Sequence, residues 1–147
     1  MTKKNILIFS TALIVAVLDQ LSKVLIRKNL QLNESIPIIK NIFHLTYLTN
    51  TGSAFGLFKN LNPFFTIFSV IVVIAIFYII TKVKKNQKLM QFAFGLLLGG
   101  TFGNLTDRLI YGAVTDFIDF RIWPVFNAAD SAVTISIIIF IILLWEK

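Results

Sequence analysis

The sequence predicts a membrane protein of the mainly α class, with four transmembrane helices, cytoplasmic N- and C-termini and a small extracytoplasmic β element between the first two helices. Composition is the first reason, because 56% of the 147 residues are hydrophobic and the mean hydropathy is +0.82. A soluble domain of this size cannot bury so much apolar surface. The second reason is that long apolar stretches alternate with short basic or polar segments. We expect residues 1–147 to form a single integral membrane domain.

The first apolar stretch runs from about Ile6 to Ile26 and follows two lysines. It resembles a secretory signal peptide, but the run is long and no small-residue cleavage site follows it, so we expect a retained helix. With the lysines in the cytoplasm, a rise of about 1.5 Å per residue places Asp19 in the outer half of the bilayer. Lys23 lies four residues further on, on the same helical face, and can balance its charge.

Residues 27–62 form the longest polar segment. The β-branched and aromatic residues from Phe43 to Thr49 predict a strand, and Gly52 and Gly56 allow tight turns after it. We therefore expect a small sheet on the outer membrane surface, with aromatic side chains in contact with the interface. These aromatic residues are Phe43, Tyr47, Phe55 and Phe58.

The second predicted span runs from about Pro63 to Thr81, because Asn62 before Pro63 is typical of an N-cap followed by the first helical turn. A lysine cluster follows the span, and under the positive-inside rule it returns the chain to the cytoplasm. Its members are Lys82, Lys84, Lys85 and Lys88. Although the net charge is +7, lysines gathered beside apolar runs favour a role in topology over nucleic-acid binding.

The third predicted span runs outward from about Leu89 to Leu109. Gly95, Gly99 and Gly103 recur along it at four-residue intervals, so they share one face of the helix. Small residues at this spacing let a second helix approach closely. We expect another span to pack on this face.

The fourth predicted span starts near Asn127 and ends at Trp145, which returns the C-terminus to the cytoplasm. The first, third and fourth helices each bring polar residues to their outer ends, while their inner halves contain almost none. We therefore expect one polar site at the boundary of the outer leaflet.

Four aspartates are the candidate functional groups of this site, because a charged side chain near the bilayer centre costs roughly 2.5 to 3.5 kcal/mol and needs a reason. They are Asp107, Asp116, Asp119 and Asp130. Each also has a structural interpretation. Asp107 and Arg108 fit polar contacts between helices, and Asp119 has an arginine close by. Asp116 fits a solvated loop residue, and Asp130 fits a helix N-terminal cap. Local context leaves open which two would act together.

The chemistry that these groups support is acid–base catalysis by carboxylates. The chain has no cysteine and one histidine, His44, so it contains no cluster to hold zinc, and we expect neither a metal nor another cofactor. His44 fits a structural strand residue, and Ser53 does not match a nucleophile elbow. Two nearby aspartates share a proton, so one can activate water while the other protonates the scissile carbonyl or the leaving amine. This is the logic of aspartic proteolysis.

Two other classes of protein are alternatives. Intramembrane aspartates also serve as proton relays in transporters, but a transporter usually has a midplane site and internal repeats, and the sequence shows no convincing repeat. A non-catalytic bundle would use its polar residues only to hold helices together or to bind lipids. Its function would tolerate Asp116→Asn and Asp130→Asn.

Five short blocks of the chain resemble, in order, those of the lipoprotein signal peptidase family, also called signal peptidase II. The blocks are DQLSK at 19–23, NTGSAFG at 50–56, GGTFGNLTDR at 99–108, VTDF at 114–117 and FNAAD at 126–130. They extend from the first predicted helix to the last, so the resemblance covers nearly the whole chain.

The resemblance implies an intramembrane aspartic endopeptidase that removes signal peptides from bacterial prolipoproteins, immediately before the diacylglyceryl-modified cysteine. It implies that Asp116 and Asp130 are the catalytic aspartates. The residues that it implies as substrate-binding or site-shaping are Asp19, Lys23, Asn50, Gly52, Phe55, Asn104, Arg108 and Asn127.

The resemblance also implies where the enzyme acts and with what. We expect a monomer in the bacterial cytoplasmic membrane, with its active site at the outer leaflet. Its partners would be membrane lipid and the diacylglyceryl-prolipoprotein substrate, and not nucleic acid. The surface sheet around Asn50 to Gly56, together with the external segment near Trp123, would clamp the extended peptide. The segment between Asp116 and Asp130 is short for the family.

Overall fold

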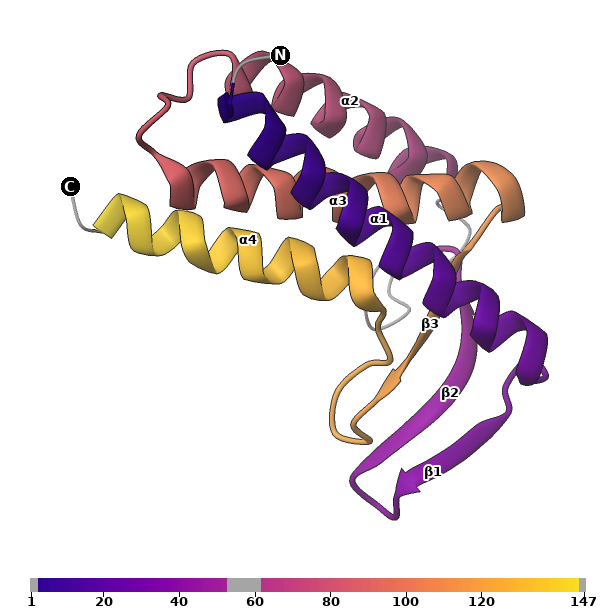
Figure 1. Cartoon of the computed structure of the whole chain (residues 1–147). Coiled ribbons are helices and arrows are strands. Elements are labelled where there is room, and N and C mark those ends of the chain that lie inside the picture. The colour runs from indigo at the N-terminus through magenta and orange to yellow at the C-terminus, as the bar shows by residue number, and fades with distance from the viewer. Residues whose placement is uncertain (1–2, 53–61, 146–147) are drawn as a thin grey trace.

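The fold, seen in a computed structural model that describes residues 3–52 and 62–145, combines four helices with a three-stranded antiparallel sheet (Figure 1). The helices are α1 (Lys3–Asn29), α2 (Asn62–Ile80), α3 (Lys88–Tyr111) and α4 (Ala128–Trp145). The strands are β1 (Ser35–Ile39), β2 (Phe43–Asn50) and β3 (Val114–Asp119), in the sheet order β1-β2-β3. The sheet extends from one end of the helical bundle.

Helix α3 is the centre of the bundle, and α1, α2 and α4 each pack against it (Figure 1). Twelve residues of the 24 in α3 are buried, whereas α2 buries three of its 19. The outer helices expose many leucine, isoleucine and phenylalanine side chains. That distribution is the one expected of a bundle whose solvent is lipid.

The glycine face of α3 contacts α1, as its spacing predicts. A Cβ atom added to Gly95 would lie 2.8 Å from the carbonyl oxygen of Ile8, and one added to Gly99 would lie 2.6 Å from that of Ala12. Gly100 allows the same close approach between α3 and α4, because a Cβ atom added to it would lie 2.5 Å from the carbonyl oxygen of Ala129. Backbone therefore approaches backbone on two sides of α3.

Three of the four helices are long and apolar enough to cross a membrane, within the described part of the chain. The candidate spans are Asn5–Asn29, Asn62–Ile80 and Ala128–Trp145. Helix α3 was predicted as a span but is not among them. Its glycines and its polar outer end lower its hydropathy, and the other helices cover the face that carries them. The chain is a membrane protein with at least these apolar helices exposed for contact with lipid.

The sheet contains more of the chain than the sequence predicted. The predicted strand over residues 43–49 is confirmed as β2, and β1 precedes it. The prediction confined the β element to the segment between the first two helices, and this is wrong, because β3 comes from the connection between α3 and α4. Strand β3 pairs with β2 so that Asp116 lies opposite Leu48.

The start of α2 differs from the predicted N-cap at Asn62. Helix α2 begins at the predicted place, but the Asn62 side chain does not act as an N-cap, because its buried Oδ1 has no hydrogen-bond partner in the structure.

Replacing Gly99 with alanine tests the close approach of α1 and α3. The new Cβ would clash with backbone, so we expect the variant to lose about 1 to 3 kcal/mol of stability, although alanine favours helix over glycine by about 1 kcal/mol. Thermal melting in detergent measures the loss. Leu109→Ala is the control, because Leu109 lies in the same helix and is 66% exposed. An unchanged or higher melting temperature for Gly99→Ala would contradict the packing.

Candidate active site

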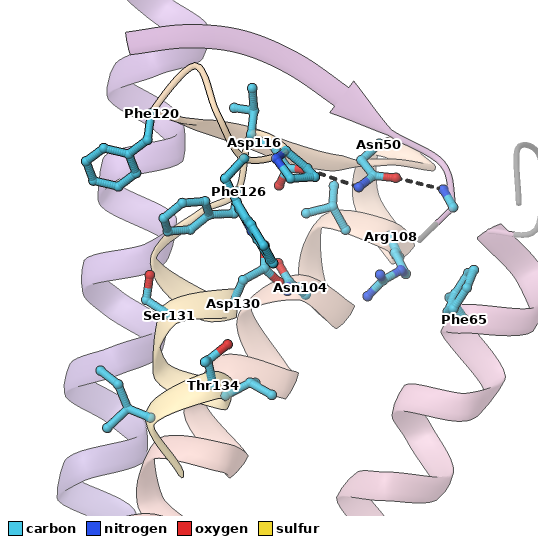
Figure 2. A pocket seen from close by; sticks show the side chains of 17 residues that line it. Asn50, Phe65, Asn104, Arg108, Asp116, Phe120, Phe126, Asp130, Ser131 and Thr134 are labelled. Atoms are coloured by element: carbon cyan, nitrogen blue, oxygen red, sulfur yellow. Dashed lines mark hydrogen bonds between the residues drawn. The ribbon is translucent and has the colours of Figure 1, made fainter. Parts of the chain in front are cut away.

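Asp116 is buried on strand β3, with an exposed fraction of 3%. Both of its carboxylate oxygens accept hydrogen bonds from side-chain amides. Asn127 Nδ2 donates to Oδ1 at 2.7 Å, and Asn50 Nδ2 donates to Oδ2 at 3.0 Å. The interpretation of Asp116 as a solvated loop residue is therefore wrong. Pairing of β3 with β2 brings Asn50 to this carboxylate, although 66 residues separate the two in sequence (Figure 2).

Asp130 lies in the first turn of α4. Its Oδ2 accepts the backbone N–H of Asn127 at 3.2 Å, while Asn127 Oδ1 accepts the backbone N–H of Asp130 at 2.9 Å. This reciprocal pair is a capping box, so the capping interpretation of Asp130 is confirmed. The second oxygen, Oδ1, accepts a hydrogen bond from Asn104 Nδ2 at 2.8 Å. The cap still leaves part of the Asp130 side chain accessible, because the residue is only partly buried.

A pocket of about 710 Å³ contains both carboxylates. Asp116 and Asp130 lie on its wall, and Asn127 donates to both of them, through its side chain to one and its backbone to the other. Phe65 of α2, Arg108 of α3 and residues 133–135 of α4 belong to the helical part of the wall, so the pocket extends between α2 and α4 over the C-terminal end of α3 (Figure 2).

The pKa of Asp116 lies in the neutral range. Burial and then the nearby Asp130 carboxylate raise the pKa of Asp116 to about 7, while hydrogen bonds from Asn50 and Asn127 act in the opposite direction. A carboxyl group with such a pKa exchanges its proton near neutral pH. It can therefore serve as an acid or a base under physiological conditions.

A cluster of buried charges lies beneath the two aspartates, between α1 and α3. Lys23 Nζ is 2.8 Å from Asp19 Oδ2 and 3.5 Å from Asp107 Oδ2, and all three side chains are 0% exposed. Gln20 Nε2 donates to Asp19 and Asp107, at 3.2 and 3.1 Å. The predicted pairing of Asp19 with Lys23, and the predicted role of Asp107 between helices, are confirmed. Arg27 also contacts Asp107, at 3.5 Å.

The acidic members of this cluster hold the neighbours of the two pocket aspartates. Asp107 Oδ2 accepts the backbone N–H of Thr115 at 2.9 Å, one residue before Asp116. Asp19 Oδ1 accepts the backbone N–H of Ala129 at 3.0 Å, one residue before Asp130.

Two further members of the cluster, Gln20 and Arg27, were not predicted from the sequence. Arg27 carried a signal, because it lies four residues after Lys23 and eight after Asp19, on one helical face.

The remaining predicted site residues fall into three groups. Arg108 lies in the pocket, with its guanidinium carbon 5.7 Å from the centre of the Phe65 ring. Gly52 is buried, and its N–H donates to Asn50 Oδ1 at 3.0 Å. Phe55, with Ser53, Gly56 and Phe58, lies outside the described residues.

Two other titratable candidates from the sequence belong to the sheet. Asp119 pairs with Arg121 at 2.9 Å, which confirms that it is charge-balanced, and its Oδ2 also accepts a hydrogen bond from Thr46. His44 lies on β2 with its Nδ1 at 3.0 Å from Ser35 Oγ, as expected of a structural strand residue. In the described ranges, 3–52 and 62–145, no group of three or more histidine, cysteine or acidic side chains could hold a metal ion.

Comparisons with known proteins agree over nearly the full chain. A family model described as signal peptidase (SPase) II matches residues 11–146. The lipoprotein signal peptidase of Halothermothrix orenii is 42% identical over 143 residues, which cover 96% of this chain and 97% of that one. That of Moorella thermoacetica is 47% identical over 135 residues, covering 92% and 88%. A solved structure described as a bacterial membrane enzyme, at 1.9 Å resolution by the in meso method, aligns with a TM-score of 0.87 and 35% identity over 95% of this chain and 93% of that one.

The raised pKa of Asp116 predicts a pH dependence of stability. A carboxyl group whose pKa rises from 3.8 to about 7 on folding binds more protons in the folded state, so its contribution to stability falls as pH rises between these values. Each pKa unit corresponds to about 1.4 kcal/mol. We therefore expect the melting temperature of the wild type to fall from about pH 5 to about pH 8 by more than that of Asp116→Asn. Parallel melting curves for the two proteins would rule out the shift.

Proposed function

The chain belongs to the signal peptidase II family, and from this premise we propose which residues carry out the reaction and how. Membership makes the chain a membrane-bound aspartic endopeptidase that cleaves signal peptides from lipoproteins. We assign the catalytic roles to Asp116 and Asp130. The observation that supports this assignment is that both carboxylates lie on the wall of one pocket and are joined through Asn127.

The proposed mechanism requires the two carboxyl groups to share one proton. The ionised carboxylate removes a proton from a water molecule, whose oxygen attacks the carbonyl carbon of the scissile peptide bond. The protonated carboxyl donates its proton to the carbonyl oxygen, which gives a gem-diol intermediate. The first carboxyl, which now holds the proton from water, donates it to the amide nitrogen, and the second carboxylate takes a proton from one gem-diol hydroxyl. The C–N bond breaks, a carboxylic acid and an amine leave, and the pair again holds one proton. The two carboxyl groups titrate as a unit, because the pKa values of such coupled groups belong to the pair.

The hydrogen bonds of the chain direct the shared proton into the pocket. Each oxygen of Asp116 and Asp130 already accepts an N–H group from the protein. An N–H group cannot accept a hydrogen bond, so a proton held by either carboxyl has no acceptor among these partners. The remaining acceptors are the other carboxyl group of the pair and the oxygen atoms that substrate or water brings into the pocket. The donors therefore leave both carboxyl groups available for catalysis while fixing their positions.

The substrate that we propose is a diacylglyceryl-modified prolipoprotein, cut immediately before the lipidated cysteine. Such a substrate has its acyl chains in lipid and its scissile bond near the membrane surface. The pocket joins an apolar region between α2 and α4 to a polar end beneath the sheet, which suits this combination. We place Asn50, Gly52 and Asn127 beside the scissile bond.

The orientation that we propose puts both termini and the lysine turn at 82–88 in the cytoplasm. All four helices then span the bacterial cytoplasmic membrane, with α3 enclosed by the others, and the sheet and pocket lie at the outer leaflet. We propose a monomer that needs no metal or other cofactor, because carboxylates activate water unaided. Lipid is the surrounding solvent of the exposed helical faces. Of the clamp predicted around Asn50 to Gly56 and near Trp123, residues 53–56, including Phe55, lie outside the described residues, and the clamp stays a prediction.

Arg108 is proposed to bind the substrate. Its guanidinium group is only partly buried, lies in the pocket over the Phe65 ring and makes no hydrogen bond to the described residues in the structure. The structure thus leaves five N–H donors for acceptors that enter the pocket. Peptide carbonyl and ester carbonyl oxygens are the acceptors that a lipidated signal peptide provides.

Removal of either carboxylate tests the catalytic pair. We expect Asp116→Asn and Asp130→Asn to lower kcat for a diacylglyceryl prolipoprotein in detergent by about 10²- to 10⁴-fold, the usual contribution of a general acid or base. Thermal melting verifies that both variants fold. Asp119→Asn is the matched control, since Asp119 lies on the same strand as Asp116 but pairs with Arg121. Full activity in a folded Asp116 or Asp130 variant would refute the pair.

Substitution of Arg108 tests its role in substrate binding. A hydrogen bond to a charged group contributes about 1.5 to 3 kcal/mol, so Arg108→Leu should raise KM by about 10- to 100-fold and change kcat less. Arg108→Lys keeps the positive charge, so its KM should lie between that of the wild type and that of Arg108→Leu. If kcat falls and KM does not change, the residue acts on the reaction and not on binding.

A further inference from the structure

Lys23 is the one buried lysine of the described chain, and its surroundings give it an additional role. Its ammonium group donates to Asn104 Oδ1 at 2.9 Å, besides its contacts with Asp19 and Asp107. Neutralising two carboxylates would not require the contact with Asn104. That contact joins the buried charge cluster to the catalytic pocket, because Asn104 also donates to Asp130.

An ammonium group can only donate hydrogen bonds. The atom of Asn104 that faces Lys23 must therefore be the carbonyl oxygen, Oδ1. The opposite atom of the same amide is then Nδ2, which lies 2.8 Å from Asp130 Oδ1. The charge of Lys23 thus requires this orientation of the Asn104 side chain, and the hydrogen bond that Asn127 Nδ2 donates to the same Oδ1 at 3.1 Å supports it.

The other two amides at the pocket are oriented by backbone donors. Asn127 Oδ1 accepts the N–H of Asp130, and Asn50 Oδ1 accepts the N–H of Gly52. Neither amide can rotate without losing a backbone hydrogen bond. Asn104 differs from them, because its Oδ1 accepts only from side chains: the Lys23 ammonium group of α1 at 2.9 Å and Asn127 Nδ2 at 3.1 Å.

We propose that Lys23 is a positioning residue that fixes the amide of Asn104, so that Asp130 always meets an N–H donor and never a carbonyl oxygen. A donor at this place favours the ionised carboxylate. If the amide rotated, its carbonyl oxygen would face Asp130 and favour the protonated acid instead. Lys23 would then control the proton of the catalytic pair without touching substrate. This inference rests on the proposed catalytic pair.

The pH dependence of kcat measures this control. The charged and titratable groups around Lys23 and Asn104 are Asp19 and Arg27 of α1, Asp107 and Arg108 of α3, Asp116 of β3 and Asp130 of α4. Removing a positive charge from this group could shift the profile by electrostatics alone. A test must therefore separate the lost hydrogen-bond donor from the lost charge.

Three variants make that separation. Lys23→Met removes both the ammonium donor to Asn104 and one positive charge, and it leaves only the weaker, uncharged donor Asn127 Nδ2 at Asn104 Oδ1. Lys23→Met combined with Asp19→Asn removes the donor but keeps the net charge, and it avoids leaving Asp19 unpaired, so that folding is preserved. Arg27→Met removes one positive charge from the same cluster but keeps the donor, because Arg27 contacts Asp107 and Thr115 and not Asn104.

We expect the pH profile of kcat to change when the donor from residue 23 to Asn104 is lost, and not when a positive charge alone is lost. In Lys23→Met and in the double variant, the kcat profile should move to higher pH by about one unit, so that kcat on the acid limb falls about tenfold while KM stays the same. Lys23→Arg, which restores a donor cation, should move the profile back toward that of the wild type. Arg27→Met should keep the wild-type profile.

The opposite pattern would overturn the inference. If the double variant has the wild-type profile and Arg27→Met has the shifted one, charge alone sets the proton of the pair. If both Lys23 variants fold and keep the wild-type profile, Lys23 has only a structural role. Either result leaves the catalytic pair standing, because Asp116→Asn and Asp130→Asn test that pair separately.

Discussion

The burial of the Lys23 ammonium group is the constraint on which the rest of the structure depends. Taking an ion out of water costs several kcal/mol unless its partners are close and well oriented. Asp19 and Asp107 meet this need from α1 and α3, so these helices must approach closely. Gly103 makes the approach possible, because an added Cβ would lie 2.5 Å from Asp19 Oδ2. The same two carboxylates hold the backbone beside each proposed catalytic residue, at Thr115 and Ala129. Neutralising one cation thus positions β3 and α4 together.

Much of the fold could be predicted because it depends on local patterns. Apolar length predicts the helices, and the four-residue spacing of the glycines correctly predicts a close helix contact. Strand β3 could not be predicted in this way. Its sequence is typical of a polar loop. The strand can be buried because Asp107, Asn127 and strand β2 form hydrogen bonds with its polar groups. Strand β2 lies far away in sequence, with 66 residues between Asn50 and Asp116. Asp107 and Asn127 lie 8 and 11 residues from their partners in other elements. Neither kind of partner follows from the residue pattern of the strand itself.

The candidate site shows the same division between local and distant information. Asp19 with Lys23, and Asp119 with Arg121, are neighbours in sequence, and their pairing could be predicted from spacing. Asp116 could be selected from the sequence only through the family resemblance, since its neighbours in sequence suggested an exposed residue. What makes it a candidate catalyst is burial together with Asn50, which a strand pairing across the chain provides. Spacing predicted Arg108 as a helix contact and only the family resemblance implied it as a site residue, while its position against Phe65 of α2 became visible only in the structure.

The pairing of β2 with β3 also bears on when the protease becomes active during its biosynthesis. Strand β2 and its Asn50 leave the ribosome early, whereas Asp116 and Asp130 belong to the last quarter of the chain. No segment that ends before α4 contains both carboxylates. Contacts between segments so distant in sequence also form late in folding. The proposed catalytic pair is therefore complete only after the chain has been synthesised as far as α4.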